Sequence, residues 1–229
     1  MPHSRWYTSF RCLTGLLSLS SDPPNHHPEL INHQESGSIR DAISAVERAL
    51  DAATARIADR YVRLPVHGGS PVPRERLYCY ELYHQLRRAL GDDFGFSVGG
   101  EVDKRGHTIM RGLGLTNVKP DLLIHVPGDM AGNLIVIEVK SVSVRDKRPI
   151  RKDLETLTAF RCAGYRRAWY LFFGGSEKDA AKARDRCQLA AAEHGKVEVR
   201  LDQIGLLWHR GQGTSVVRLP WMLPRAGNR

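Results

Sequence analysis

The stretch NLIVIEVK, residues 133–140, constrains the fold of this chain more than any other part of its sequence. Residues 134–137 are all apolar and predict the centre of a buried strand. Glu138 and Lys140 then place opposite charges on one face, because residues two apart in a strand point to the same side. Buried charges are costly unless they are paired or used, so we expect this strand to end in a functional or paired site.

A second predicted strand, KPDLLIHVP, comes just before the first and is joined to it by a short turn, GDMAG. If the hairpin turn is centred between Asp129 and Met130, Asp121 lies directly opposite Glu138. Directly opposed residues of a hairpin share a face, with Cβ atoms about 5 Å apart. The register therefore predicts that Asp121, Glu138 and Lys140 converge on one patch.

Two carboxylates in such a patch repel each other, and a divalent cation removes the repulsion. Mg²⁺ prefers oxygen ligands of this kind and keeps several waters. Lys140, next along the same face, is placed to hold an anionic substrate or to orient a nucleophilic water. The alternative is a solvated strand end with Asp121 as an ordinary turn residue after proline.

The PD of residues 120–121 and the EVK of residues 138–140, on neighbouring predicted strands, resemble the PD-(D/E)xK nuclease superfamily. The resemblance implies an α/β domain of the restriction-endonuclease-like type, a central mixed sheet flanked by helices, here with an N-terminal helical extension. It implies Asp121 and Glu138 as metal-binding acids and Lys140 as the catalytic lysine. Many members carry a further acid on the preceding helix; Glu81 occupies that place here, and Glu101 is a less certain candidate.

The function that this resemblance implies is metal-dependent hydrolysis of phosphodiester bonds by an endonuclease, with DNA rather than RNA as substrate. Mg²⁺, or Mn²⁺ in its place, would be held by Asp121, Glu138 and the carbonyl of Val139, and would activate a water. The alternative is a catalytically inactive, basic nucleic-acid-binding or assembly subunit that keeps the same fold.

The chain divides into four predicted parts: a mobile tail (1–37), a long amphipathic helix with a linker (38–73), the nuclease-like core (74–210) and a C-terminal tail (211–229). The helix at 38–64 is expected to pack on the core, or to bind a second copy or a partner subunit. Within the core we predict helices at 74–90, 149–164 and 176–195, and strands at 94–104, 165–173, 196–201 and 206–210 besides the hairpin.

The net charge of +9 and the pI near 9.6 favour a polyanionic partner, and nucleic acid is the one we expect. Residues 141–170, directly after the predicted site, hold eight Lys or Arg against three acids. A phosphate backbone needs such a flank. We predict Lys147, Arg148, Arg151 and Lys152 as nucleic-acid-binding residues; the alternative is a solvated basic helix face.

The four cysteines are far apart and form no CxxC pair, so we expect no disulfide and a cytoplasmic protein. No apolar run approaches the roughly 20 residues that cross a bilayer, so no membrane association is expected.

Overall fold

The structure is a computed structural model that describes residues 28–101, 119–129 and 131–222. Its centre is a six-stranded sheet whose strands follow chain order. The pairs β3–β4–β5 and β7–β8 are antiparallel, whereas β5, β6 and β7 are parallel. The strands are β3 (Ser97–Gly100), β4 (Leu122–His125), β5 (Asn133–Ser141), β6 (Arg167–Phe173), β7 (Ile204–His209) and β8 (Val217–Leu219).

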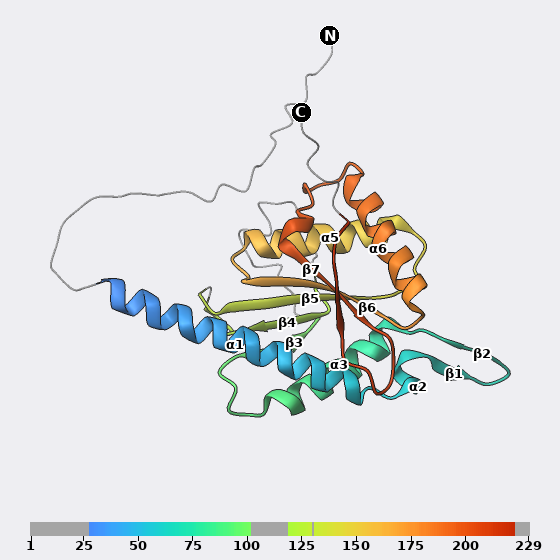
Figure 1. The fold of residues 1–229 in the computed structure, drawn as a ribbon, viewed down its shortest axis with the longest axis horizontal. Coiled ribbons are helices and arrows are strands. Elements are labelled where there is room, and N and C mark those ends of the chain that lie inside the picture. Colours follow the sequence, from blue (N-terminus) through green and yellow to red (C-terminus); the bar gives the residue numbers. More distant parts are fainter. Residues whose placement is uncertain (1–27, 102–118, 130, 223–229) are drawn as a thin grey trace, which may run out of the picture.

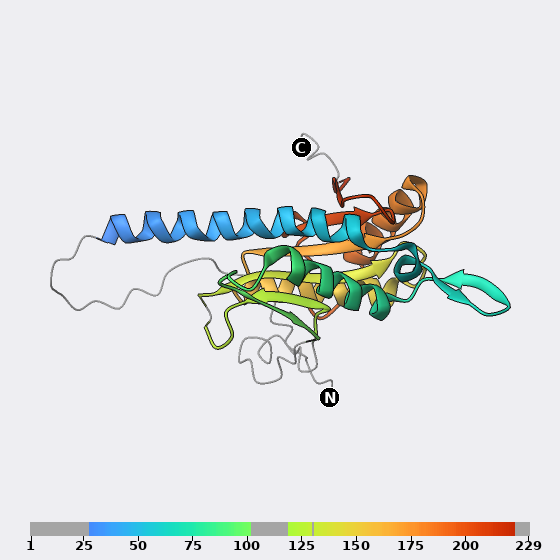
Figure 2. The same cartoon turned by 90° about the horizontal axis from the view of Figure 1, so that it is seen from below.

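Helices cover both faces of this sheet (Figure 1). On one face lie the crossover helices α5 (Lys147–Cys162) and α6 (Glu177–Ala192). On the other lie α1 (Pro28–Arg56) and α3 (Glu75–Leu90), side by side in Figure 2. The expected α/β domain, with a mixed sheet between helices, is confirmed at this level.

Strand β5 lies between two separate apolar clusters, because its side chains alternate between the two faces of the sheet. Val136 packs on the α5 and α6 side. Ile135, Ile137 and Val139 pack on the α1 and α3 side. Glu138 and Lys140 share the face of Val136, so they point toward α5.

The predicted hairpin register is confirmed where it matters for the site. Leu122 pairs with Ile137, and Leu123 with Val136. The register shifts only nearer the turn, before His125. Extended by one residue, the same register sets Asp121 opposite Glu138.

Two predicted boundaries on the N-terminal side are corrected. The long helix begins at Pro28, not at residue 38, and a proline suits the first helical position. It ends at Arg56, followed by the short α2 (Asp59–Val62). The predicted linker is a two-stranded hairpin, β1 (Leu64–Val66) with β2 (Gly69–Val72), that projects beyond the sheet (Figures 1 and 2). Residues 1–27 of the predicted tail lie outside the described residues.

The predicted strand at 196–201 is wrong. The backbone N–H of Lys196 donates to the Glu155 carboxylate at 2.8 Å, and the Val197 carbonyl accepts from Arg151 at 2.6 Å. These groups therefore bond to side chains of α5 rather than to a strand ladder. The chain then forms a 3₁₀ turn, Leu201–Gln203, and only afterwards β7. The predicted C-terminal tail contains β8, and residues 102–118 of the predicted strand and loop lie outside the described ranges.

The apolar face of α1 is covered by the chain's own core. Val46, Leu50, Ala53 and Ile57 are at most 1% exposed. They pack in one cluster with residues of α3 and β5, including Leu82. Over these described residues, the face is therefore occupied by the chain's own core.

Two further expectations concern cysteines and membranes. Cys79 and Cys187 are buried free thiols, and burial raises the pKa of both. Cys162 is disulfide-bonded, so the expectation of no disulfide is wrong for this residue. Within the described residues, no helix has the length and apolar character needed to cross a membrane.

Candidate active site

Asp121 and Glu138 meet at the carboxyl end of β5, as their register requires. The Val139 N–H donates to Asp121 Oδ2 at 2.7 Å, and the two carboxyl side chains are hydrogen-bonded to each other. Burial raises the pKa of Glu138, and the charges of Asp153 and Asp121 raise it further. Burial also raises the pKa of Asp121, against the Val139 hydrogen bond. In both carboxyl groups the protonated form is therefore favoured more than in a free carboxylic acid.

Lys140 lies beside this pair and is fixed by two other carboxylates. Its Nζ is 3.1 Å from Glu75 Oε2 on α3 and 3.1 Å from Asp153 Oδ2 on α5. Burial works against its charged form, but Asp153 and Glu75 outweigh this and raise the pKa of Lys140. Lys140 therefore stays a cation and does not serve as a base at neutral pH.

Asp153 is a site residue that the sequence reasoning missed. It accepts a hydrogen bond from Tyr170 Oη at 3.1 Å as well as the contact with Lys140. Burial raises its pKa to about 6, although Lys140 opposes the shift. A signal for it was present: Asp153 lies in the apolar stripe of α5 with Ile150 and Leu154, where a carboxylate must have a partner.

The acid that α3 contributes is Glu75, not the predicted Glu81. Glu81 accepts a hydrogen bond from Gln85 at 2.8 Å, and none of its described contacts reaches the site. Glu81 follows Glu75 by six positions, which sets the two side chains about 120° apart around a helix. Glu75 is four residues before buried Cys79 and seven before buried Leu82, so this spacing could have identified it.

Glu101 touches the site through its backbone and not through its carboxylate. Its N–H donates to the Asp121 carbonyl at 3.2 Å. Its side chain is exposed and forms an ion pair with Arg76 at 3.2 Å. The less certain acid is therefore not part of the carboxyl cluster.

The donor set suits one hard cation that keeps waters. Among the residues that the structure describes, no group of three or more His, Cys, Asp or Glu is arranged to hold a metal. Asp121 and Glu138 are nevertheless two neighbouring oxygen donors, and Mg²⁺ commonly uses one or two carboxylates, which it binds in competition with protons. The Val139 carbonyl lies on the same side of β5 as its N–H, which contacts Asp121, so it is the third predicted oxygen.

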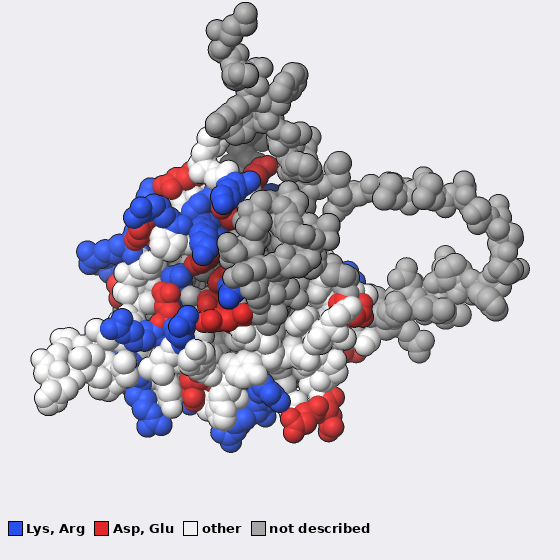
Figure 3. All heavy atoms as spheres, turned by 180° about the vertical axis from the view of Figure 1, so that it is seen from behind, with Lys and Arg blue, Asp and Glu red and all other residues white. Residues whose placement is uncertain are grey.

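The predicted nucleic-acid-binding residues of α5 divide into exposed and buried ones. Arg151 is only 8% exposed; it donates to Glu155 at 3.0 Å and to the Ala191 carbonyl at 2.6 Å, so it is structural and its assignment was wrong. Lys147, Arg148 and Lys152 are exposed. Lys147 pairs with Glu193 and Arg148 with Asp146. Figure 3 accordingly shows Lys and Arg mixed with acids over this face rather than one unbroken basic surface.

Comparison with known proteins yields no relative for this chain. No family model, no curated protein and no solved structure matches it. Any functional assignment therefore depends on the site itself.

Proposed function

We propose that this protein is a metal-dependent nuclease that hydrolyses phosphodiester bonds, with DNA rather than RNA as substrate. One observation carries the proposal: two hydrogen-bonded carboxyls, Asp121 and Glu138, meet beside the buried cation Lys140 at the end of the central strand. A purely structural ion pair would need one acid and one base. Here Lys140 forms ion pairs with Glu75 and Asp153, and two further carboxyls, Asp121 and Glu138, lie beside it with raised pKa values and no ion pair to it.

Each residue has a separate task in this proposal. Asp121, Glu138 and the Val139 carbonyl would hold Mg²⁺, or Mn²⁺ in its place. The bound ion would polarise the phosphoryl oxygen and lower the pKa of an attacking water. Lys140, kept protonated, stabilises charge on the phosphoryl oxygens as the water attacks and the P–O bond breaks. Glu75 and Asp153 position Lys140 from two different helices.

The test compares purified full-length protein with two matched aspartate variants. Substrates are closed plasmid, linear duplex, single-stranded DNA and RNA of the same sequence, each with Mg²⁺, Mn²⁺ or EDTA. We expect cleavage with either metal, none in EDTA and faster cleavage of DNA. Asp121→Asn keeps an oxygen for the Val139 N–H but loses the metal-binding charge, so it should abolish cleavage.

Asp129→Asn is the control, because Asp129 lies at the other end of the same hairpin and its Oδ1 only accepts from the Ala131 N–H. This variant should cut at the wild-type rate. Binding of DNA without cleavage under every metal condition would favour the inactive binding subunit instead.

A further inference from the structure

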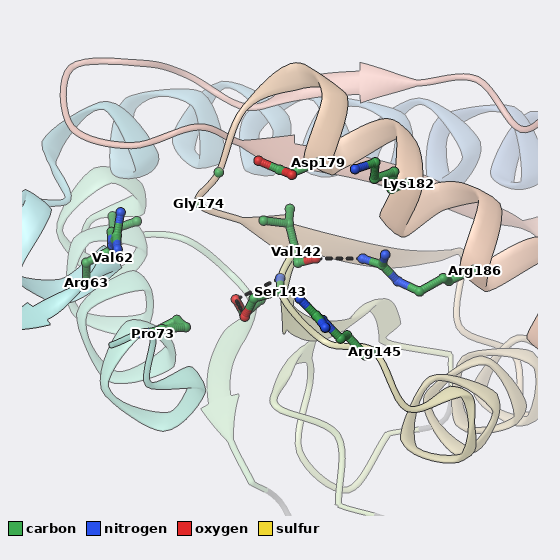
Figure 4. A pocket seen from close by; sticks show the side chains of 12 residues that line it. Val62, Arg63, Pro73, Val142, Ser143, Arg145, Gly174, Asp179, Lys182 and Arg186 are labelled. Carbon is green, nitrogen blue, oxygen red and sulfur yellow. Dashed lines mark hydrogen bonds between the residues drawn. The ribbon is translucent and has the colours of Figure 1, made fainter. Parts of the chain in front are cut away.

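A cavity of about 490 Å³ lies beyond the carboxyl ends of the parallel strands β5 and β6. Its wall comes from the loop after β5, the first turns of α6 and the base of the β1–β2 hairpin (Figure 4). Ligands of open α/β sheets commonly bind at this edge. We call this cavity, lined by Arg63, Ser143, Arg145, Gly175, Lys182 and Arg186 among others, the basic pocket.

The basic pocket carries a clear excess of positive charge. Arg63, Arg145, Lys182 and Arg186 line it, against the single acid Asp179. The Asp179 carboxylate is already engaged, since it accepts from the Ser176 N–H at 3.0 Å and from Ser176 Oγ at 2.7 Å. This excess of positive charge favours binding of an anion.

A buried donor in the basic pocket lacks a protein partner. Nη2 of Arg186 donates to the Val142 carbonyl at 2.7 Å, which fixes the side chain, as Figure 4 shows. Its Nε is buried, and no hydrogen-bond partner for it exists among the described residues. Leaving such a buried donor unsatisfied costs about 1–3 kcal/mol.

Gly175 lies where the start of α6 comes close to the loop after β5. Gly175 has a φ of +70°, and a Cβ there would lie 2.5 Å from Val142 Cγ2. Only glycine therefore lets the start of α6 approach the loop after β5. The N-terminus of this 16-residue helix adds partial positive charge to the same region.

The basic pocket is linked to the candidate active site through one carboxylate. Ser141 lines the pocket and directly follows Lys140. The Ser141 N–H donates to Glu75 Oε1 at 3.3 Å, while Glu75 Oε2 binds Lys140 Nζ at 3.1 Å. The pocket and Lys140 therefore adjoin each other at the end of β5.

We infer that the basic pocket binds the terminal phosphate of a nucleic-acid strand, so that the protein prefers linear strands with a phosphorylated end to strands without one. This inference rests on the proposed function and adds a substrate class to it. The volume suits a group of about one nucleotide, near the lower end of ligand pockets. A terminal phosphate carries about −1.5 to −2 charges, against −1 for an internal diester, and so matches the excess of four cations over one acid better.

The binding test uses full-length protein in EDTA, where no metal-dependent cleavage can occur. Anisotropy is measured with three oligonucleotides of one sequence, carrying a 5′-phosphate, a 3′-phosphate or neither. We expect one phosphorylated end to bind about tenfold more tightly than the unphosphorylated strand, because charge-assisted hydrogen bonds supply such a factor. Inorganic phosphate at millimolar concentration should remove the preference. Equal affinity for all three strands would overturn the inference.

Two pairs of variants localise the effect. Lys182→Ala should reduce the preference severalfold, whereas Lys178→Ala, one turn earlier on α6 and outside the pocket lining, should not. Arg145→Ala should act like Lys182→Ala. Arg148→Ala should act like Lys178→Ala, because Arg148 pairs with Asp146 outside the pocket. A preference that survives both pocket variants would place the phosphate elsewhere and also overturn the inference.

A parallel cleavage assay in Mg²⁺ separates this inference from the proposed function. Preference for a phosphorylated end without any cleavage would support the basic pocket and contradict the nuclease. Cleavage of phosphorylated and unphosphorylated strands at equal rates would support the nuclease and contradict the pocket's role.

Discussion

Lys140 is positioned by acids from two helices on opposite faces of the sheet, Glu75 and Asp153. In the proposed mechanism this double contact fixes the ammonium relative to Asp121 and Glu138. In this mechanism α3 acts through one side chain in its first turn, Glu75.

Glu75→Gln should therefore lower the cleavage rate by about tenfold or more, since a lost charged contact of about 1.5–3 kcal/mol loosens Lys140. Glu81→Gln, the same change on the same helix, should leave the rate nearly unaltered. Single-turnover rates with saturating enzyme measure both. If Glu81→Gln lowers the cleavage rate more than Glu75→Gln does, the functional acid of α3 is Glu81, as the sequence predicted.

The carboxyl cluster also predicts how stability without metal depends on pH. The pKa of Asp153 is raised from 3.8 to about 6 in the folded protein. Between these values the unfolded chain loses the proton while the folded protein keeps it. Asp153 thus favours folding fully below about pH 4, and this contribution is lost as pH rises through about 6.

Asp153→Asn should flatten this part of the stability profile by an amount on the order of 2 kcal/mol between pH 4 and pH 7. Urea unfolding at a series of pH values, in EDTA, measures it. The pKa of Glu138 is raised as well, so some slope should remain. An identical slope in wild type and variant would show that Asp153 does not titrate in this range.

Sequence patterns could predict three residues of the candidate site, but not the two acids that contact Lys140. Asp121, Glu138 and Lys140 followed from strand alternation and one hairpin register, which are local rules. Glu75 and Asp153 depend on which faces of α3 and α5 meet the sheet. That is a tertiary property, visible in the sequence only as acids spaced with buried apolar residues.

At the scale of elements, α5 combines an exposed basic side with a buried polar contact. Arg151 joins α5 to the end of α6 and to the segment before β7 through the carbonyls of Ala191 and Val197. Its charge is balanced by Glu155 at 3.0 Å. Side chains of α5 form hydrogen bonds with the backbone of the segment before β7. This one arrangement explains both wrong predictions, the strand at 196–201 and Arg151 as a nucleic-acid-binding residue.

Arg151→Ala should destabilise the fold by about 3 kcal/mol, because it leaves buried Glu155 without its partner. Lys152→Ala, at the exposed neighbouring position, should change stability by less than about 0.5 kcal/mol. Chemical unfolding of the two variants compares them directly. Equal stabilities would mean that the buried ion pair has no structural role.

At the scale of the whole molecule, α1 completes the core on the face opposite α5 and α6. From residue 37 onward, where burial is described, the buried apolar residues of α1 run from Ile43 to Ala53. The element order and the coarse sheet topology could be predicted, since helical and strand periods alternate clearly along the chain. The start of α1 and strand β8 could not, because short or polar segments carry little periodicity.

Removing residues 1–37 should leave a folded protein whose melting temperature changes by only a few degrees. Removing residues 1–57 should abolish cooperative melting, because the core then loses side chains such as Val46 and Leu50. Burial of each of these side chains stabilises the fold by about 1.5–3 kcal/mol. Differential scanning calorimetry distinguishes the two. Cooperative unfolding of the shorter chain would show that the core does not need α1.

The proposed metal-dependent hydrolysis at Asp121 and Glu138 is tested most directly by the cleavage rate of Glu138→Gln in Mg²⁺. Glutamine keeps the size of the side chain and a hydrogen bond to Asp121, but removes the charge that would hold the cation. We predict a rate at least about a hundredfold below wild type, with cooperative melting retained. A folded Glu138→Gln variant that cuts within about twofold of the wild-type rate would contradict the assignment of this site.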